Sequence, residues 1–210
     1  FWVRQRSEGW KAQGVDRPLV ALEAAGYSSL YAYRYDWNDQ EDSFLIKFSE
    51  VLGAAHASEI SFVQGKAMYG PIGSYMYPDS ESARDMTDIM MTAWGNFARD
   101  GRPGTVKGDA WAPFVSRAPH YMVLDSLGNH ELRADAASME AIFAEVADTD
   151  LLSSNDRCIL AWELATALGD PAYGAYRRWN GGECADVDVR ALRKSIREAL
   201  EDEFGTTSVL

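Results

Sequence analysis

Aromatic side chains recur at every second position near the start of the chain, at 31, 33, 35 and 37. This two-residue period, together with the aromatic enrichment, predicts a β-strand within residues 27–37. Two further extended runs, Tyr121–Leu124 and Glu131–Arg133, flank a Ser-Leu-Gly-Asn turn and predict a hairpin. The strands are few, and long loop or helical segments separate them.

A three- and four-residue apolar spacing predicts a helix most clearly over residues 80–100, where Ser82-x-x-Asp85 resembles a capping box. The apolar face of this helix carries Met86, Ile89, Met90, Ala93, Trp94 and Phe97. We expect Trp94 and Phe97 to lie in the core rather than in a pocket, because they belong to that face.

Helical spacing also marks both ends of the sequence. Residues 1–26 predict a helix that is interrupted at Gly14, and the chain after residue 135 predicts only helices, the last capped by Asp186 or Asp188. The segment before the 80–100 helix is a loop rich in Gly, Pro and Tyr. Strand, loop, helix, hairpin and helices in this order indicate a mixed α/β chain.

The charge balance narrows the partners that the chain could bind. Twenty Lys and Arg residues face 32 Asp and Glu residues, which gives a net charge of −12 over 210 residues. Phosphate contacts need clustered basic residues, so the sequence argues against a nucleic-acid partner. The composition is 47% apolar and 25% charged, which is typical of a globular chain. No apolar run approaches the roughly 20 residues of a membrane span, so none is expected.

The two cysteines, Cys158 and Cys184, lie 26 positions apart and form neither a zinc signature nor a disulfide framework. One bridge and two free thiols are both open, and so is the cellular compartment. The position of Cys158 among apolar helical residues favours an inert buried thiol.

Of three histidines, His56 has the most suggestive setting, because Gly, Ala and Ser residues surround it between Gly53 and Glu59. Small neighbours let a substrate approach an imidazole, and a loop after a strand is a common place for a catalytic group. His56-x-x-Glu59 supplies at most two metal ligands, so no metal is expected. His120 and His130 are expected to be structural or surface residues.

A nucleophile is missing from these motifs. The serine elbow Gly-x-Ser-x-Gly follows a strand, whereas residues 26–30, Gly-Tyr-Ser-Ser-Leu, lack the second glycine and precede one. Neither a P-loop nor a Gly-x-Gly-x-x-Gly motif is present. The residues by themselves therefore offer a candidate general base and no group for it to activate.

Several segments resemble, in order, the C-terminal part of the type-B carboxylesterases, the cholinesterase-like branch of the α/β-hydrolases. Residues 31–37, YAYRYDW, resemble the YxYRFDW-like strand of that family, and residues 53–65, GAAHASEISFVQG, resemble its GAxHGxELxYVFG segment with the triad histidine. Residues 90–103 are similar to its MxxxWxNFAxxGxP helix. Trp111–Phe114 and Tyr121–Asp125 are similar to the WPxY and YLxLD elements.

Two residues depart from the family segment. Ala57 replaces the usual glycine after the histidine, which adds one methyl group beside the ring and should be tolerated. Gln64 replaces the usual aromatic residue and could change the polarity of a pocket.

The resemblance implies an α/β fold in which residues 1–210 form the C-terminal portion of an α/β-hydrolase domain. This C-terminal portion would contain the last strands of the sheet and the helices that flank them, and it would be incomplete on its own. Residues 1–134 would supply the strands, the histidine loop and one helix, and residues 135–210 a mostly helical tail. An isolated active fragment is disfavoured, because the last strands of a sheet would leave an open edge and an uncovered apolar face.

The implied function is carboxylic ester hydrolysis by a serine esterase, with His56 as the general acid and base of the catalytic triad. Because the chain order is Ser, acid, His, the serine and its oxyanion hole are expected upstream of Phe1. The expected partners are a small-molecule ester and the N-terminal part of the same enzyme, without a cofactor. A non-catalytic cholinesterase-like adhesion or binding module is the alternative, and the fragment alone is expected to be inactive.

Other residues near His56 have two interpretations each. Glu59 could make a structural loop hydrogen bond or act in catalysis, and the structural role is favoured. Five loop residues could line an acyl or alcohol pocket or simply pack: Phe62, Met68, Tyr69, Tyr75 and Met76.

Overall fold

The computed structural model describes residues 1–66, 68, 70–166 and 173–205. The chain divides into two compact units. The sheet unit is Leu19–Asp135, and the helical unit combines Phe1–Pro18 with Ala136–Leu210. The first residues of the chain therefore group with the helical tail and not with the segment that contains His56.

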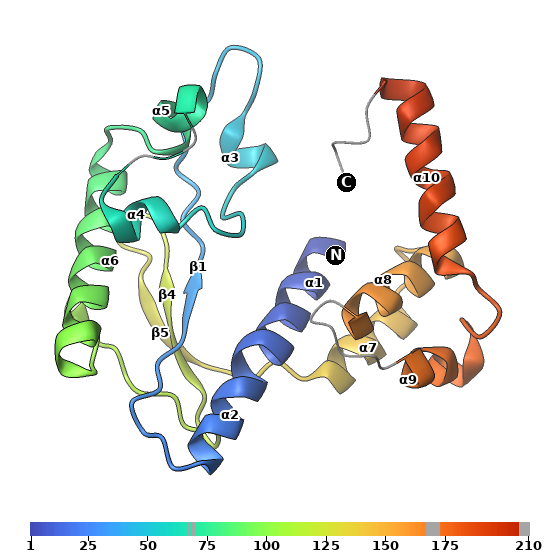
Figure 1. Ribbon diagram of the computed structural model, residues 1–210, viewed down its shortest axis with the longest axis horizontal. Helices are drawn as coiled ribbons and strands as arrows, with labels where there is room; N and C mark the ends of the chain where they lie inside the picture. The colour runs from blue at the N-terminus through green and yellow to red at the C-terminus, as the bar shows by residue number, and fades with distance from the viewer. Residues whose placement is uncertain (67, 69, 167–172, 206–210) are drawn as a thin grey trace. The chain divides into compact units, whose positions relative to one another are not determined.

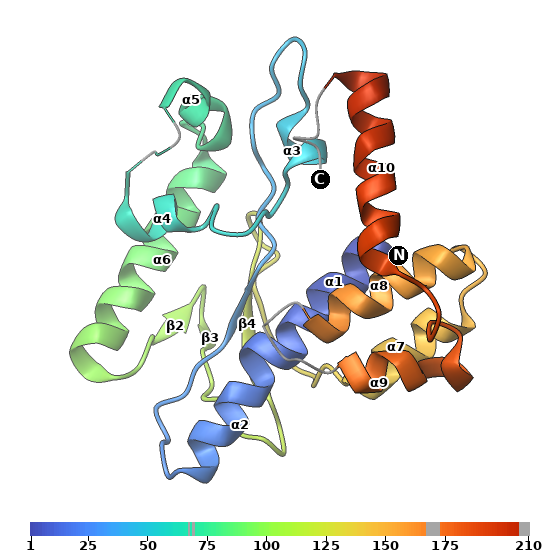
Figure 2. The ribbon, with the colours of Figure 1, turned by 45° about the vertical axis from the view of Figure 1, so that its right-hand side comes forward.

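The sheet unit is built on three strands in the order β1-β4-β5 (Figure 1). β1 (Tyr33–Tyr35) runs parallel to β4 (His120–Leu124), and β5 (Glu131–Ala134) runs antiparallel to β4. The predicted hairpin is thus confirmed. A separate antiparallel ribbon joins β2 (Thr105–Val106) to β3 (Asp109–Ala110), as Figure 2 shows.

The aromatic strand is confirmed at its centre but is shorter than the alternation predicts. Tyr33 pairs with Met122 in register, and hydrogen bonds extend the contact with β4 by one residue at each end of β1. The N–H of Met122 donates to the carbonyl of Ala32 at 3.0 Å, and the N–H of Asp36 donates to that of Leu124 at 2.8 Å. Pairing with β4 therefore fixes the limits of this strand.

The core of the sheet unit lies between this sheet and α6 (Glu81–Asp100). Burial of each large apolar side chain contributes about 1.5–3 kcal/mol to the stability of the folded state. Trp94 packs against this core as expected, whereas Phe97 is 44% exposed even though its ring meets Tyr31 edge-on. The buried members are Trp37, Phe62, Ala83, Met86, Met90, Ala93, Val106, Trp111, Met122 and Leu124.

The N-terminus of α6 differs from the expected capping box. Ser80, not Ser82, caps the helix, and its hydroxyl accepts a hydrogen bond from the N–H of Ala83 at 3.1 Å. The hydroxyl of Ser82 instead accepts from the indole N–H of Trp37 at 2.8 Å. Gly101, with φ of +68°, ends the helix in the left-handed conformation that a glycine adopts without strain.

Short helices fill the segment between β1 and α6. The expected Gly-, Pro- and Tyr-rich loop contains two of them, because single turns can form without a long apolar period. Their bounds are α3 (Phe48–Val51), α4 (Ile60–Gln64), η2 (Gly70–Ile72) and α5 (Gly73–Met76).

The helical unit confirms the predicted helical tail over the described residues. The predicted interruption near Gly14 is a π-helical segment, η1. Asp188 caps the last helix by accepting from the N–H of Ala191 at 3.0 Å. The elements, several of which Figure 1 labels, are α1 (Trp2–Trp10), η1 (Lys11–Asp16), α2 (Arg17–Ala24, which continues into the sheet unit), α7 (Met139–Asp148), α8 (Ser154–Thr166), α9 (Tyr173–Arg178), η3 (Trp179–Gly182) and α10 (Val189–Phe204).

α1 approaches α8 closely at a glycine. A Cβ built on Gly9 would lie 2.5 Å from Cδ2 of Leu164, so a side chain there would require the Leu164 side chain to move. Among the described residues, no helix is both long and apolar enough to cross a bilayer.

Cys158 and Cys184 form a disulfide between α8 and the segment that precedes α10. The expectation of an inert buried thiol at Cys158 is therefore wrong. Both side chains are completely buried and belong to a cluster that includes Ile159, Tyr176 and Val189. Sequence spacing left the pairing open because it does not report distance between helices.

Candidate active site

His56 lies in the turn that connects α3 to α4, and its side chain is exposed. The next residue, Ala57, has a φ of +67°, which is in the left-handed region. This conformation costs a residue with a Cβ roughly 1–2 kcal/mol. Replacing the family glycine by Ala57 therefore costs free energy through the backbone conformation. The expectation had placed the effect in a methyl group beside the ring.

Hydrogen bonds fix the backbone on both sides of the imidazole. Both the N–H and the hydroxyl of Ser58 donate to the carbonyl of Ala55, at 3.1 Å and 2.7 Å. Earlier in the turn, the amide of Gln40 donates to the carbonyl of Gly53 at 2.7 Å. The hydroxyl of Tyr77 donates to the carbonyl of Ser58 at 2.5 Å. Residues well outside the turn therefore hold it.

Glu59 accepts a hydrogen bond from a residue of β1. Its carboxylate accepts a hydrogen bond from the hydroxyl of Tyr33 at 3.3 Å. Burial, followed by the nearby negative charge of Glu59, raises the pKa of Tyr33 to about 12. Burial also raises the pKa of Tyr35, which lies two residues further along β1. Tyr33 therefore stays a neutral donor to the carboxylate at ordinary pH.

The pocket candidates that the structure describes do not gather around one cavity. Phe62 is 2% exposed and packs edge-on against Trp37 with centroids 4.8 Å apart, and Met76 is also buried. Tyr75 stacks on Phe48 at 5.5 Å, and Met68 is exposed. A further candidate, Tyr69, lies outside the described residues.

An open depression of about 220 Å³ lies between α4 and the first turns of α6. Of the described pocket candidates, only Phe62 lines it, beside polar residues such as Lys66 and Arg84. Gln64 is exposed on α4 and is not among the lining residues, so its expected effect on pocket polarity has no counterpart at this depression. His56 does not line it either.

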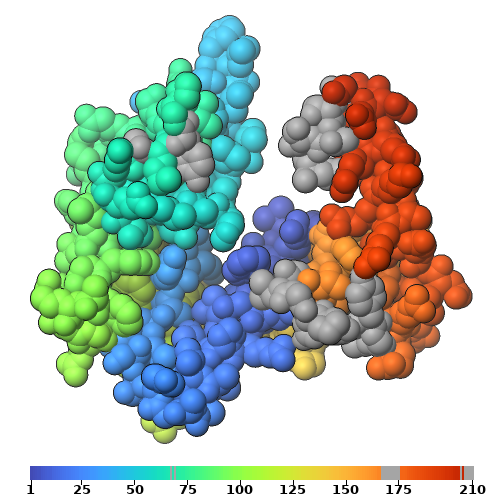
Figure 3. Space-filling view, viewed as in Figure 1, coloured from blue at the N-terminus to red at the C-terminus, as the bar shows by residue number. Residues whose placement is uncertain are grey.

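Exposed apolar side chains flank the His56 turn along the sequence. Phe44 and Leu45 are almost entirely exposed in the loop between β1 and α3, a segment that appears light blue in Figure 3. Val51, Leu52 and Ile60 are also exposed, on α3 and α4 or at their ends. Several large apolar side chains that are close to His56 in the sequence are therefore in contact with solvent.

The outer edge of β1 is also open. Ala32 and Asp36 direct backbone groups to β4, so the alternate residues Tyr33 and Tyr35 direct theirs to the opposite edge. Within the part of the chain that the structure describes, β1 has no partner strand on that side. An unpaired edge can accept a further strand.

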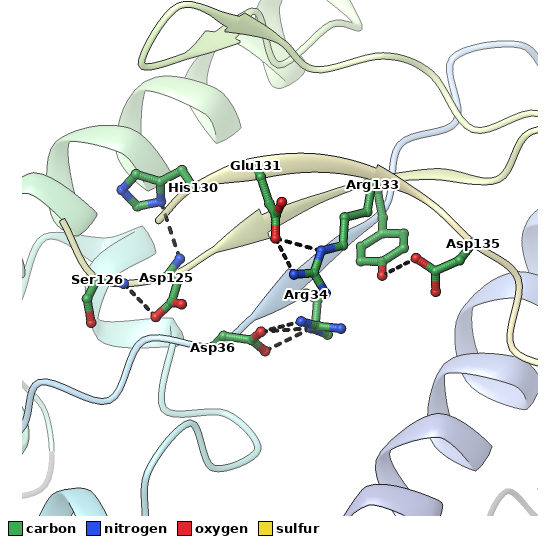
Figure 4. A network of polar contacts seen from close by, with 9 residues as sticks. Arg34, Asp36, Asp125, Ser126, His130, Glu131, Arg133 and Asp135 are labelled. Carbon is green, nitrogen blue, oxygen red and sulfur yellow. Dashed lines mark hydrogen bonds and ion pairs between the residues drawn. The ribbon is translucent and has the colours of Figure 1, made fainter. Parts of the chain in front are cut away.

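The other two histidines lie on the β4–β5 hairpin. His130 is buried, and its Nδ1 accepts a hydrogen bond from the N–H of Asp125 at 3.2 Å (Figure 4). That bond leaves the proton of the neutral ring on Nε2, which lies 3.5 Å from the carboxylate of Asp85. Asp85 also pairs with Lys107. His120 lies in β4 with a buried Nδ1.

Sequence reasoning missed a polar network across the β1-β4-β5 sheet, which Figure 4 shows. Arg34 donates to Asp36, with Nε 2.9 Å from the carboxylate, and lies 5.8 Å from the centre of the Tyr121 ring. The hydroxyl of Tyr121 donates to Asp135 at 2.6 Å. Burial, followed by this bond, raises the pKa of Tyr121 to about 12. The polar positions that alternate with the aromatics in the first strand were the available signal.

Metal-binding side chains do not cluster in the described residues, where no three His, Cys, Asp or Glu groups are placed to hold an ion. The candidate side chains there are an exposed imidazole, a carboxylate three residues later and the Tyr33 hydroxyl that donates to this carboxylate. Such groups can transfer and orient protons.

The described elements form a mixed α/β protein with a small sheet, many helices and an exposed histidine turn, which is compatible with an α/β-hydrolase fold. Residues 17–141, more than half of the chain, match the model of the carboxylesterase family. The chain belongs to this family, and its matched region is related to the cholinesterase-like type-B carboxylesterases.

One curated relative illustrates the relationship. An acetylcholinesterase from Gallus gallus is 33% identical over 113 residues, which cover 52% of this chain and 14% of the relative. The chain thus spans only a small part of the length of that protein.

Proposed function

We propose that this chain is the histidine-bearing segment of a carboxylic ester hydrolase. His56 is the general acid and base of a serine triad, and the serine, the acidic residue and the oxyanion hole belong to a part of the enzyme upstream of Phe1. The main support is the position of His56, exposed within the family-matched residues 17–141 in a turn that neighbouring residues hold in one backbone conformation.

In this mechanism His56 takes the proton of the serine hydroxyl as the oxygen attacks the ester carbonyl. It then donates that proton to the leaving alcohol, and later activates a water molecule that releases the acid. The upstream carboxylate would orient the imidazole, and Glu59 keeps its contact with Tyr33. An exposed imidazole is compatible with this role because the serine must approach it from another segment.

The surfaces beside His56 support completion of the site by another segment. The outer edge of β1 is open for pairing in the described residues, and Phe44 and Leu45 present apolar surface to solvent. An upstream strand and its connecting helices would cover both features, because sheets of this class are covered by helices on both faces. The sheet unit would then be the last part of a larger α/β-hydrolase sheet.

Two preparations test this proposal. The first is a protein that contains the proposed upstream part as well as this chain, and the second is the 210-residue chain alone. A fluorophosphonate probe should label the first on a serine upstream of Phe1 and should leave the second unlabelled. Labelling and ester turnover by the second would refute an upstream nucleophile.

The role of His56 is tested by substitution in the longer protein. His56→Ala should lower kcat for a simple aryl ester by roughly 10⁴-fold or more, because triad members act as a unit. The matched control is His120→Gln, which changes another imidazole and should retain turnover. A longer protein that binds a partner but neither reacts with the probe nor hydrolyses esters would instead be a non-catalytic binding module.

A further inference from the structure

Tyr77 contacts the His56 turn from 19 positions beyond Ser58 in the sequence. Its hydroxyl donates to the carbonyl of Ser58 at 2.5 Å. The Tyr77 ring packs edge-on against Phe62, with centroids 5.2 Å apart and an interplanar angle of 76°. Because Phe62 is part of the core, the position of the hydroxyl is set by the core and not by the turn itself.

The turn needs such an outside contact because Ala57 is held in the left-handed region. For a residue with a Cβ, this conformation is disfavoured by a factor of roughly 5 to 30. An unusual backbone conformation persists only where surrounding contacts impose it. The short-range bonds of Ser58 to Ala55 act on one side of Ala57, and the 2.5 Å bond from Tyr77 acts on the carbonyl beyond it.

We propose that Tyr77 is a positioning residue for His56. Its hydroxyl holds the Ser58–Glu59 peptide, one residue beyond Ala57, and this keeps the left-handed turn that directs the imidazole. The inference rests on the proposed role of His56 for its effect on catalysis, but its structural part concerns the turn alone. Without the hydroxyl, Ala57 would move towards the right-handed region and His56 would change its direction.

Tyr77→Phe removes the hydroxyl and keeps the ring that packs on Phe62. In the 210-residue chain, amide hydrogen exchange at Ser58 and Ile60 should become about five- to tenfold faster, as expected for the loss of one hydrogen bond. The amide of Met122 in β4 reports on the rest of the sheet unit and should keep its rate. The matched control is Tyr27→Phe, which removes an exposed hydroxyl far from the turn in sequence.

Ala57→Gly provides the second arm, because glycine adopts the left-handed conformation at little cost. Added to Tyr77→Phe, it should return the exchange at Ser58 most of the way to the original rate. In the longer protein, Tyr77→Phe should lower kcat about tenfold with little change in KM, and Ala57→Gly should restore most of it.

Two results would overturn the proposal. One is exchange at Ser58 in the Tyr77→Phe chain that equals the Tyr27→Phe control. The other is faster exchange at Ser58 and Met122 alike without rescue by Ala57→Gly, which would make Tyr77 a general packing residue. If the turn responds as expected while the unsubstituted longer protein lacks esterase activity, the proposed function fails and the control of the turn by Tyr77 stands.

Discussion

Removal of the Cys158–Cys184 bridge tests how the helical unit is stabilised. The double variant Cys158→Ala, Cys184→Ala frees a loop whose ends are 26 positions apart. Loop-closure entropy for that length corresponds to about 3.5 kcal/mol of stability. Both sulfur atoms are fully buried, so small cavities add to the loss. Since a domain has a total stability of only about 5–15 kcal/mol, the helical unit should be strongly destabilised.

Amide hydrogen exchange separates this effect from a change in the whole chain. Protection of Leu160 and Ala161 in α8 should fall about 300-fold, because each 1.4 kcal/mol corresponds to a factor of ten. Protection of Met90 in α6, which belongs to the sheet unit, should stay the same. A reductant should produce a similar loss in the unsubstituted chain and none in the double variant. A loss below tenfold in α8, or an equal loss in α6, would refute this reasoning.

Two further predictions concern the sheet unit. Trp37→Phe removes a fully buried indole and its 2.8 Å hydrogen bond to Ser82. We expect the free energy of unfolding, measured in urea, to fall by about 2–4 kcal/mol. A decrease below about 1 kcal/mol would contradict this prediction. Burial raises the pKa of Tyr33 and Tyr121 to about 12, above the value of about 10 in an unfolded chain, so their contribution to stability is complete below pH ~10 and is lost as the pH rises towards 12. The urea concentration at the midpoint of unfolding should therefore decrease as the pH is raised from about 9 to about 11. The decrease should be smaller in Tyr121→Phe. A midpoint that stays constant would show that these hydroxyls titrate normally.

Sequence reasoning succeeded where neighbouring residues decide the conformation. The apolar face of α6 and the stop at Gly101 both depend on residues within a few positions, and so does the cap at Asp188. The same reasoning failed at Ser82, whose hydroxyl meets Trp37, 45 positions away, and left the cap to Ser80. A local motif cannot show that a more distant partner will take its side chain.

The candidate site shows the same division. Motifs around His56 indicated the family, and the match to residues 17–141 confirms it. The pattern could not show that Phe62 would be buried in the core, because a five-residue helix does not reveal which face packs inward. Nor could it show the left-handed conformation of Ala57 or the contact from Tyr77.

The sequence by itself determined the family, most helices and the hairpin, because periodicity, caps and motifs are properties of neighbouring residues, and it singled out His56 as a candidate. Only the tertiary structure decided the disulfide, the limits of β1 and the contacts that hold the His56 turn. Each of these joins residues that are far apart in the chain, and their approach depends on how sheet, helices and core pack together.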